Sequence, residues 1–473
     1  MTDPRASASP RPTRRTALTG IGALALAGAA GCSASGTEQT GGPAAATASP
    51  SASASAGTAT PGAPGVMELL PNPDFNFQAL FALGGAGQNS TDVGEVLTAV
   101  NTVNDSGLSN QTYTKTFADW GARLASQAGE AGGEAKAQTR RFRSLRSSAY
   151  YEQALYFVLG SDSPGDEQEV YQKGRDSWDA FASLCTPAAE TAAIRFAGKQ
   201  MPLWFFRPDT TTTRRPTIIL TNGSDGQNVD MWTYGVAAAL ERGWNALVYD
   251  GPGQGQMLFV EGVAMSTRWE TVVTPLVDWL IARDDVDPRR IALSGLSLGG
   301  NLAPRAAAFE TRLAAVIASP GCVAPWNAFP AEIRKILTPS KEETNQIWNK
   351  EVVPELPPAD RFTLSKRFEP YDAAVMRAAR QKKMFTDFYT PARVLVDLDI
   401  TKVAPGIKVP ALVVNFEDDQ FFPGQARQLY DLIGGQKDLI DMTSAQGAQL
   451  HCSPMAPQYY NEVVFDWLAD TVK

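Results

Sequence analysis

The sequence predicts an α/β protein in which helices cover both faces of a mostly parallel sheet and an all-helical domain comes first. Two observations indicate this fold class. From residue 191 onwards, short apolar runs of strand length alternate with segments of helix length, as in parallel sheets that are buried on both faces. Before residue 191, apolar residues such as Val93, Val96, Leu97 and Val100 recur at helical spacing, which predicts helices.

Six apolar runs are expected to form the parallel part of the sheet, and a hairpin is expected to precede them. The hairpin strands, residues 191–196 and 201–206, flank an Ala-Gly-Lys-Gln turn. The six runs are residues 217–220, 246–249, 291–293, 315–318, 411–415 and 439–442. An amphipathic helix over residues 459–472 is expected to end the chain.

Composition narrows the classes of function. With 44% hydrophobic residues in 473, the chain can bury a sizeable core. Its formal net charge of −8 disfavours nucleic acid as a partner. The four cysteines and single histidine include only one close pair, His451 and Cys452, whereas a metal site needs several such ligands at short spacing. We therefore expect neither a metal nor a cofactor.

The first 32 residues are typical of an export signal. Arg14-Arg15 resembles a twin-arginine motif, residues 17–30 are apolar, and Ala29-Ala30-Gly31-Cys32 resembles a lipoprotein cleavage box. This predicts a lipid on Cys32 and a protein held on the outer face of the cell membrane, with no other membrane contact. The alternative is simple secretion, because Ala27-Gly28-Ala29 also fits a cleavage site. If Cys32 carries a lipid, at most one disulfide can form among the remaining cysteines.

The rest of the chain divides into a linker and two domains. Residues 33–65 are almost entirely Ala, Ser, Thr, Gly and Pro, so we expect a disordered tether. Residues 66–190 are expected to form a helical lid domain, and residues 191–473 a catalytic domain. Within the latter, residues 321–408 are too many for an ordinary connection and are rich in helix formers, which predicts an inserted cap.

A nucleophile motif lies between a predicted strand and a predicted helix. Gly295-Leu296-Ser297-Leu298-Gly299 follows the strand at residues 290–294 and precedes the helix-compatible residues 301–310. This is the G-x-S-x-G elbow in the context that an α/β-hydrolase fold requires. Ser297 is therefore the candidate nucleophile. The alternative is a glycine-rich turn with an idle serine.

The partners of Ser297 follow from chain order. His451 is the only histidine and lies between the last strand and the final helix, where this fold places the base. The acid should follow the strand at residues 411–415, where Glu417, Asp418 and Asp419 compete. Hydrolases of this class commonly place the acid four residues before a proline. Pro423 therefore favours Asp419, with Asp418 as the alternative.

The oxyanion hole needs two backbone N–H groups. One is expected from Leu298, directly after the nucleophile. The other is expected from the loop at residues 222–226, where Ser224 is the first candidate donor and Asp225 the next. The glycine-rich residues 250–255 lack the Gly-Lys-Ser/Thr of a phosphate loop. They are interpreted as a structural turn beside the active site.

From about Phe117 to the C-terminus, the chain resembles the 2,6-dihydroxypseudooxynicotine hydrolase-like α/β-hydrolases. Besides the elbow and residues 250–255, the resemblance rests on three motifs: Arg146-Ser147-Ser148-Ala149-Tyr150-Tyr151, Val286-Asp287-Pro288-Arg289-Arg290-Ile291-Ala292-Leu293 and Gly447-Ala448-Gln449-Leu450-His451-Cys452. It implies an N-terminal helical lid, a homodimer and hydrolysis of small substrates. Some relatives cleave carbon–carbon bonds with an extra carboxylate in the cap, for which Glu332 is the nearest candidate.

The sequence thus predicts a serine hydrolase that acts on a small acyl or ketone compound, an ester, an amide or a carbon–carbon bond, through a Ser-His-Asp triad. One alternative is a dipeptidyl- or acylaminoacyl-peptidase-like enzyme, and another is a catalytically silent lipoprotein that binds at a surface. Aromatic residues of the lid and cap are together expected to enclose an apolar pocket, although for each single residue packing between helices is the favoured interpretation. They are Trp120, Tyr150, Tyr151, Tyr156, Trp326, Phe329, Trp348, Phe385 and Phe388.

Overall fold

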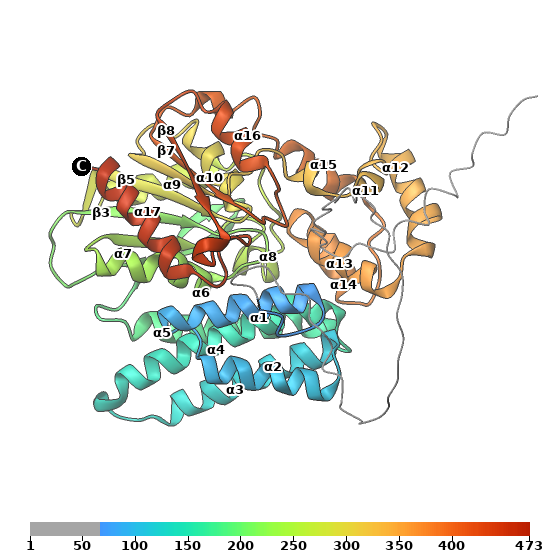
Figure 1. Cartoon of the computed structure of the whole chain (residues 1–473), viewed down its shortest axis with the longest axis horizontal. Coiled ribbons are helices and arrows are strands. Elements are labelled where there is room, and N and C mark those ends of the chain that lie inside the picture. Colours follow the sequence, from blue (N-terminus) through green and yellow to red (C-terminus); the bar gives the residue numbers. More distant parts are fainter. Residues whose placement is uncertain (1–66) are drawn as a thin grey trace, which may run out of the picture.

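The computed structural model describes residues 67–473 of the protein (Figure 1). A sheet with its covering helices forms the largest part. A layer of N-terminal helices lies along one side of it, and a group of helices from the middle of the chain lies at one end. The predicted export signal, the lipidation of Cys32 and the tether at residues 33–65 lie outside the described residues.

The sheet has eight strands in the order β1-β2-β4-β3-β5-β6-β7-β8. Strands β1 and β2 form the predicted antiparallel hairpin, β2 also runs antiparallel to β4, and the remaining pairings are parallel. The strands are β1 (Glu190–Phe196), β2 (Lys199–Phe206), β3 (Arg215–Thr221), β4 (Asn245–Tyr249), β5 (Val286–Leu296), β6 (Ala315–Ser319), β7 (Ala411–Phe416) and β8 (Lys437–Met442). Each of the six predicted parallel runs falls on one of these strands.

Helices pack on both faces of the sheet. One core contains Leu276 of α9 and Leu302 of α10, and the core of the opposite face contains Val464 of α17. All residues of β4 and of β6 are buried, as expected for strands covered on both sides. The helices of this domain are α6 (Asn228–Met231), α7 (Ala237–Glu241), α8 (Gly255–Phe259), α9 (Glu270–Ile281), α10 (Gly299–Ala307), α16 (Gln425–Leu432) and α17 (Pro457–Thr471).

The chain before the hairpin is helical, as predicted, and we call it the lid. Its helices are α1 (Pro73–Gly85), α2 (Val93–Ser106), α3 (Asn110–Glu130), α4 (Ala137–Phe157) and α5 (Glu167–Ser183). Their core is rich in aromatic residues and extends to Phe259 of α8 and Met376 of α14. The lid is therefore packed against both other parts of the molecule.

Residues between β6 and β7 form the helical insertion that the sequence predicts, and we call it the cap. Its helices are α11 (Ala331–Arg334), α12 (Lys341–Ile347), α13 (Pro358–Phe368), α14 (Ala373–Ala379) and α15 (Tyr389–Asp397). The cap shares one continuous apolar core with the α9–α10 face of the sheet. Within residues 67–473, no helix combines the length and the apolar character needed to cross a bilayer.

Candidate active site

Ser297 occupies the sharp turn between β5 and α10. Its backbone has a φ of 57°, a left-handed conformation that is uncommon for residues other than glycine. The turn leaves no room for a side chain at Gly295, because a Cβ there would lie 1.9 Å from the carbonyl oxygen of Gly299. The Ser297 N–H donates to the carbonyl of Ser319 at 2.7 Å. The turn thus holds the Ser297 hydroxyl at the carboxyl end of β5.

His451 links Ser297 to Asp419. Its Nε2 lies 2.9 Å from the Ser297 Oγ, and its Nδ1 lies 3.0 Å from the Asp419 Oδ1. The ring is 4% exposed and Asp419 is 8% exposed, so water has little access to either bond. Ser297 follows β5, Asp419 follows β7, and His451 follows β8. The structure therefore brings together the three residues that the sequence named separately.

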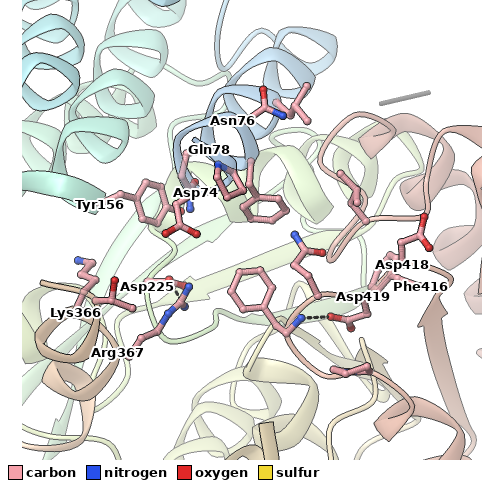
Figure 2. Close-up of a pocket in the computed structure, with 18 of the residues that line it drawn as sticks. Asp74, Asn76, Gln78, Tyr156, Asp225, Lys366, Arg367, Phe416, Asp418 and Asp419 are labelled. Atoms are coloured by element: carbon pink, nitrogen blue, oxygen red, sulfur yellow. Dashed lines mark hydrogen bonds and ion pairs between the residues drawn. The ribbon is translucent and has the colours of Figure 1, made fainter. Parts of the chain in front are cut away.

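Asp419 and its neighbour Asp418 differ sharply in environment. The Asp419 Oδ1 also accepts the N–H groups of Phe421 and Phe422 at 2.9 and 3.0 Å. Burial alone would raise the pKa of the Asp419 carboxyl, but the His451 ring and these two N–H groups hold that pKa below its ordinary value. Asp418 is exposed, and its carboxylate points away from that of Asp419 (Figure 2). The geometry therefore favours Asp419 over the alternative Asp418.

The loop between β3 and α6, residues 222–227, lies directly beside the nucleophile. A Cβ on Gly223 would come within 2.8 Å of the Ser297 Cβ, so only glycine fits at this position. Ser224 lines the same cavity as Ser297. Within the described residues, the N–H groups of Ser224 and Leu298 donate no hydrogen bond. Both predicted oxyanion donors therefore lack a hydrogen-bond partner in this part of the chain.

Gln254 holds this β3–α6 loop in place, a role that the sequence reading missed. Its Nε2 donates to the carbonyl oxygens of Asn222 and Gly223 at 2.7 and 2.9 Å, and its Oε1 accepts the N–H of Gly251 at 3.2 Å. The side chain is buried. The structural turn predicted at residues 250–255 therefore supports the loop through one glutamine side chain.

Two spaces that share part of their walls lie near Ser297. The inner cavity, about 60 Å³, contains Ser297 and His451 in its wall. The outer cleft, about 820 Å³, lies between the lid, the cap and the loop after β7. Figure 2 shows the outer cleft, with Asp74, Gln78 and Tyr156 reaching into it from the lid and Arg367 from the cap. The residues that line both spaces are Phe77, Gln78, Tyr156, Asp225, Arg367 and Phe421.

Aromatic rings and one ion pair form the boundary between the two spaces. The ring of Phe421 lies 4.6 Å from that of His451 and 5.5 Å from that of Phe77 on α1. The Arg367 guanidinium stands 4.8 Å above the Phe421 ring and reaches the Asp225 Oδ2 at 3.4 Å. Lid, cap and catalytic domain thus meet over the nucleophile.

Most of the named aromatic residues pack between helices, which is the interpretation that the sequence favours for each of them singly. Of the nine aromatic residues named from the sequence, only Tyr156 lines either of these two spaces. Trp348, Phe385 and Phe388 pack against one another inside the cap instead. Their spacing along the sequence follows from packing between helices. Sequence periodicity predicts that such residues are buried, but it does not show whether they face a neighbouring helix or a pocket.

Other side chains that could have carried chemistry lie elsewhere or are unreactive. Glu332 is exposed and pairs with Lys335 at 3.6 Å, so it is outside both spaces. Cys185, Cys322 and Cys452 are free thiols, and burial raises the pKa of the Cys452 thiol beside His451 well above its usual value. Among residues 67–473, no group of three or more His, Cys, Asp or Glu side chains could hold a metal ion.

The family comparison agrees with this geometry. Residues 218–460 match the model of the alpha/beta hydrolase family, a span that covers just over half of the chain and runs from β3 into α17. The chain belongs to the alpha/beta hydrolase family. In such hydrolases, a strand–turn–helix elbow carries the nucleophile, which is the position of Ser297 here.

Individual relatives are distant. The chain is 28% identical over 278 residues to hydrolase acrC of Aspergillus aculeatus and 29% identical over 277 residues to 20-hydroxy-prefusarin hydrolase FUS2 of Gibberella moniliformis. These alignments cover 54% and 56% of this hydrolase chain, respectively. The chain spans 64% of the length of each of these two relatives.

Solved structures support the fold, including the lid. The crystal structure of 2,6-dihydroxy-pseudo-oxynicotine hydrolase matches with a TM-score of 0.59 at 19% identity, covering 82% of this chain and 95% of the other. The structure of AbyA5 matches with a TM-score of 0.55 at 18% identity, covering 84% and 95%. At such identities the likeness shows the fold alone. It extends beyond the sheet domain, since that domain with its cap makes up a smaller share of the chain.

Proposed function

We propose that this α/β-hydrolase is a serine hydrolase with Ser297 as nucleophile, His451 as general base and Asp419 as the residue that orients the imidazole. The observation that carries the proposal is the buried, continuous hydrogen-bond chain from Ser297 Oγ through both ring nitrogens of His451 to Asp419 Oδ1. His451 takes the hydroxyl proton as Ser297 attacks a carbonyl, and returns it to the leaving group.

The N–H groups of Leu298 and Ser224 then stabilise the oxyanion that forms on the attacked carbonyl. Neither N–H has a partner within the described residues, so each can donate to the transition state without first breaking a bond. The position of Leu298 just before α10 adds the favourable field of a helix N-terminus. Removal of one such donor typically costs roughly 10²–10³-fold in rate.

The proposed substrate is a small acyl or ketone compound, cleaved at an ester, an amide or a carbon–carbon bond. The inner cavity of about 60 Å³ and its cover of lid and cap residues favour a compact reacting group over a folded polypeptide. A relative is named as a hydrolase of 20-hydroxy-prefusarin, a small molecule. The peptidase alternative predicts digestion of casein, and our proposal predicts that casein stays intact while small aryl esters are hydrolysed.

A fluorophosphonate probe tests the proposal. The wild-type protein should be labelled on Ser297, and Ser297→Ala should lose both the label and esterase activity, by roughly 10⁴–10⁶-fold. The exposed Ser126→Ala, on α3 of the lid, is the matched control and should label like the wild type. If the wild type resists the probe while a control hydrolase is labelled, the silent-lipoprotein alternative is favoured.

We also propose that the protein is exported and carries a lipid on Cys32, on the basis of the sequence of its first 32 residues. Cys32→Ala should release the protein into the medium or leave the precursor unprocessed. A mature N-terminus without lipid, found by mass spectrometry, would indicate simple secretion. A homodimer, inferred from the family resemblance, is tested by light scattering on the purified protein.

A further inference from the structure

A pair of buried carboxyl groups joins the lid to the catalytic domain close to Ser297. Glu152 lies on α4 of the lid and is 4% exposed, and Asp230 lies on α6 and is 9% exposed. Their side chains converge on one backbone N–H, that of Gln227, and line the same small space. Asp230 also lines the inner cavity that holds Ser297. The triad makes no use of either group.

The contact between the two carboxyls requires a proton. Two carboxylates both accept hydrogen bonds and repel each other, so they can bond only if one is protonated. Within the described residues no lysine or arginine forms an ion pair with either group. Burial and then the Asp230 charge raise the pKa of Glu152 well above its ordinary value, and burial also raises that of Asp230. The direction of both shifts favours a pair that holds one proton between its two carboxyl groups.

This pair is bound to the β3–α6 loop. The Gln227 N–H donates to the Glu152 Oε1 at 2.8 Å and approaches the Asp230 Oδ2 at 3.4 Å. The Gln227 carbonyl in turn accepts the Asn222 side-chain amide at 2.8 Å. Asn222 precedes Gly223, whose Cβ position falls against Ser297. A short path of hydrogen bonds thus runs from the lid to the backbone beside the nucleophile.

We propose that Glu152 and Asp230, by sharing one proton, fix the β3–α6 loop against the lid and so position the oxyanion donor beside Ser297. This role rests on the proposed serine-hydrolase function. Glu152 and Asp230 are positioning residues, because neither contacts the reacting atoms. The lid then acts indirectly, because one of its residues sets the geometry of a loop that must act on the transition state.

Charged and titratable neighbours do not replace the shared proton. The Tyr156 hydroxyl donates to the Glu152 Oε1 at 3.2 Å, and burial raises the pKa of this phenol and that of Tyr234 well above the usual range. The thiol of Cys452 is likewise held neutral by burial, which raises its pKa. Asp225 adds a negative charge on the same loop, and Arg367 is already paired with it. On the α5 side, Tyr171 and Arg175 line a small space with Glu152, and Arg175 is paired with Asp179 and Asp250. The surroundings therefore favour the protonated pair.

The sign of the pH dependence follows. Because the pKa of Glu152 is raised on folding, the contact is intact at pH values below the raised pKa and is lost as pH rises through it. Two charged carboxylates then repel, and the lid no longer holds the loop. We expect kcat to fall on the alkaline side, with a smaller effect on KM, because oxyanion donors act mainly in the transition state.

Amide substitution provides the test, using the full-length protein and 4-nitrophenyl acetate from pH 6 to pH 10. In Glu152→Gln, the side-chain oxygen still accepts the Gln227 N–H, and the NH₂ donates permanently to Asp230. This variant should keep kcat within about 3-fold of wild type at pH 7 and lose the alkaline fall. Glu152→Ala should lower kcat by roughly 10–100-fold, as a misplaced catalytic group does. Glu169→Gln, an exposed change in the lid, should leave the profile unchanged.

The same alkaline fall in Glu152→Gln as in the wild type would overturn the inference, as would an unchanged kcat in Glu152→Ala. If Glu152→Ala does not fold, the comparison of the wild type with Glu152→Gln still decides. Failure of the underlying function is recognised separately, because Ser297 would then resist the fluorophosphonate probe. Normal labelling of Ser297 together with an unaltered Glu152→Gln profile would remove only the role of the carboxyl pair.

Discussion

The floor and the roof of the active site are built in different ways. The floor consists of Ser297, Asp419 and His451, each in the turn or loop that follows a strand of one half of the sheet. The roof takes Phe77 from the lid and Arg367 from the cap, residues far apart in the chain that meet at Phe421. Local chain geometry determines the floor, whereas the packing of whole domains determines the roof. Changes in the floor should therefore affect catalysis, and changes in the roof should affect selection of the substrate.

The largest difference in kcat is expected between substitutions of two neighbouring aspartates, Asp419 of the floor and the adjacent Asp418. Asp419→Asn leaves the shape unchanged but removes the charge that orients His451, which should lower kcat by about 10⁴-fold. Asp418→Asn, the matched control at an exposed position, should change kcat by less than about 3-fold. Steady-state hydrolysis of an aryl ester measures both. The opposite order would place the acid at Asp418.

A moderate effect is expected where the floor depends on support from a second segment. Gln254→Leu removes both donors to the Asn222 and Gly223 carbonyls, so the β3–α6 loop should shift and kcat should fall by roughly 10–100-fold. The exposed Gln172→Leu on α5 provides the control. An unchanged kcat in Gln254→Leu would mean that the loop holds its position without this side chain. The floor would then not depend on support from the turn at residues 250–255.

The smallest effect is expected in the roof. Phe77→Ala removes a phenyl ring beside Phe421 and should raise the preference for bulkier acyl esters over acetate by about 10-fold, the lower end of what even a single methylene in a pocket can contribute. The kcat for acetate should change little. Relative kcat/KM values for acetate, butyrate and benzoate esters give the answer. A loss of kcat comparable to that of Gln254→Leu would show that floor and roof are not separate in function.

Sequence reasoning succeeded where a short segment carries the signal. The strand runs, the elbow around Ser297 and the lone His451 each follow from neighbours in the chain, and Asp419 follows from its spacing to Pro423. The structure places the three side chains within hydrogen-bonding distance of one another, and their catalytic roles stay predictions. The elbow is informative because the tight turn leaves no room for side chains beside Ser297, and the glycines that this requires are visible in the sequence.

The remaining residues could not be predicted, because their roles arise from contacts between distant segments. Gln254 and Glu152 contact backbone atoms of the β3–α6 loop, 31 and 75 residues away along the chain. The sequence marks the turn that contains Gln254, but it does not show which distant backbone atoms either side chain contacts. Phe77 enters the roof only because α1 packs there. Conversely, Trp348 was among the candidates for the pocket wall but is fully buried in the cap. An apolar stripe predicts that a residue is buried, but it does not show which segment packs against it.

Because Ser297 has a left-handed backbone, selection for thermal stability and selection for activity should favour different residues at this position. A serine held at a φ of 57° carries conformational strain that a glycine would not. A library of variants sorted only for resistance to heat should therefore enrich glycine at position 297, and would thereby discard the proposed nucleophile. Any effort to make this hydrolase more robust by directed evolution has to screen for turnover in the same round, because at this one position the more durable protein is an inert one.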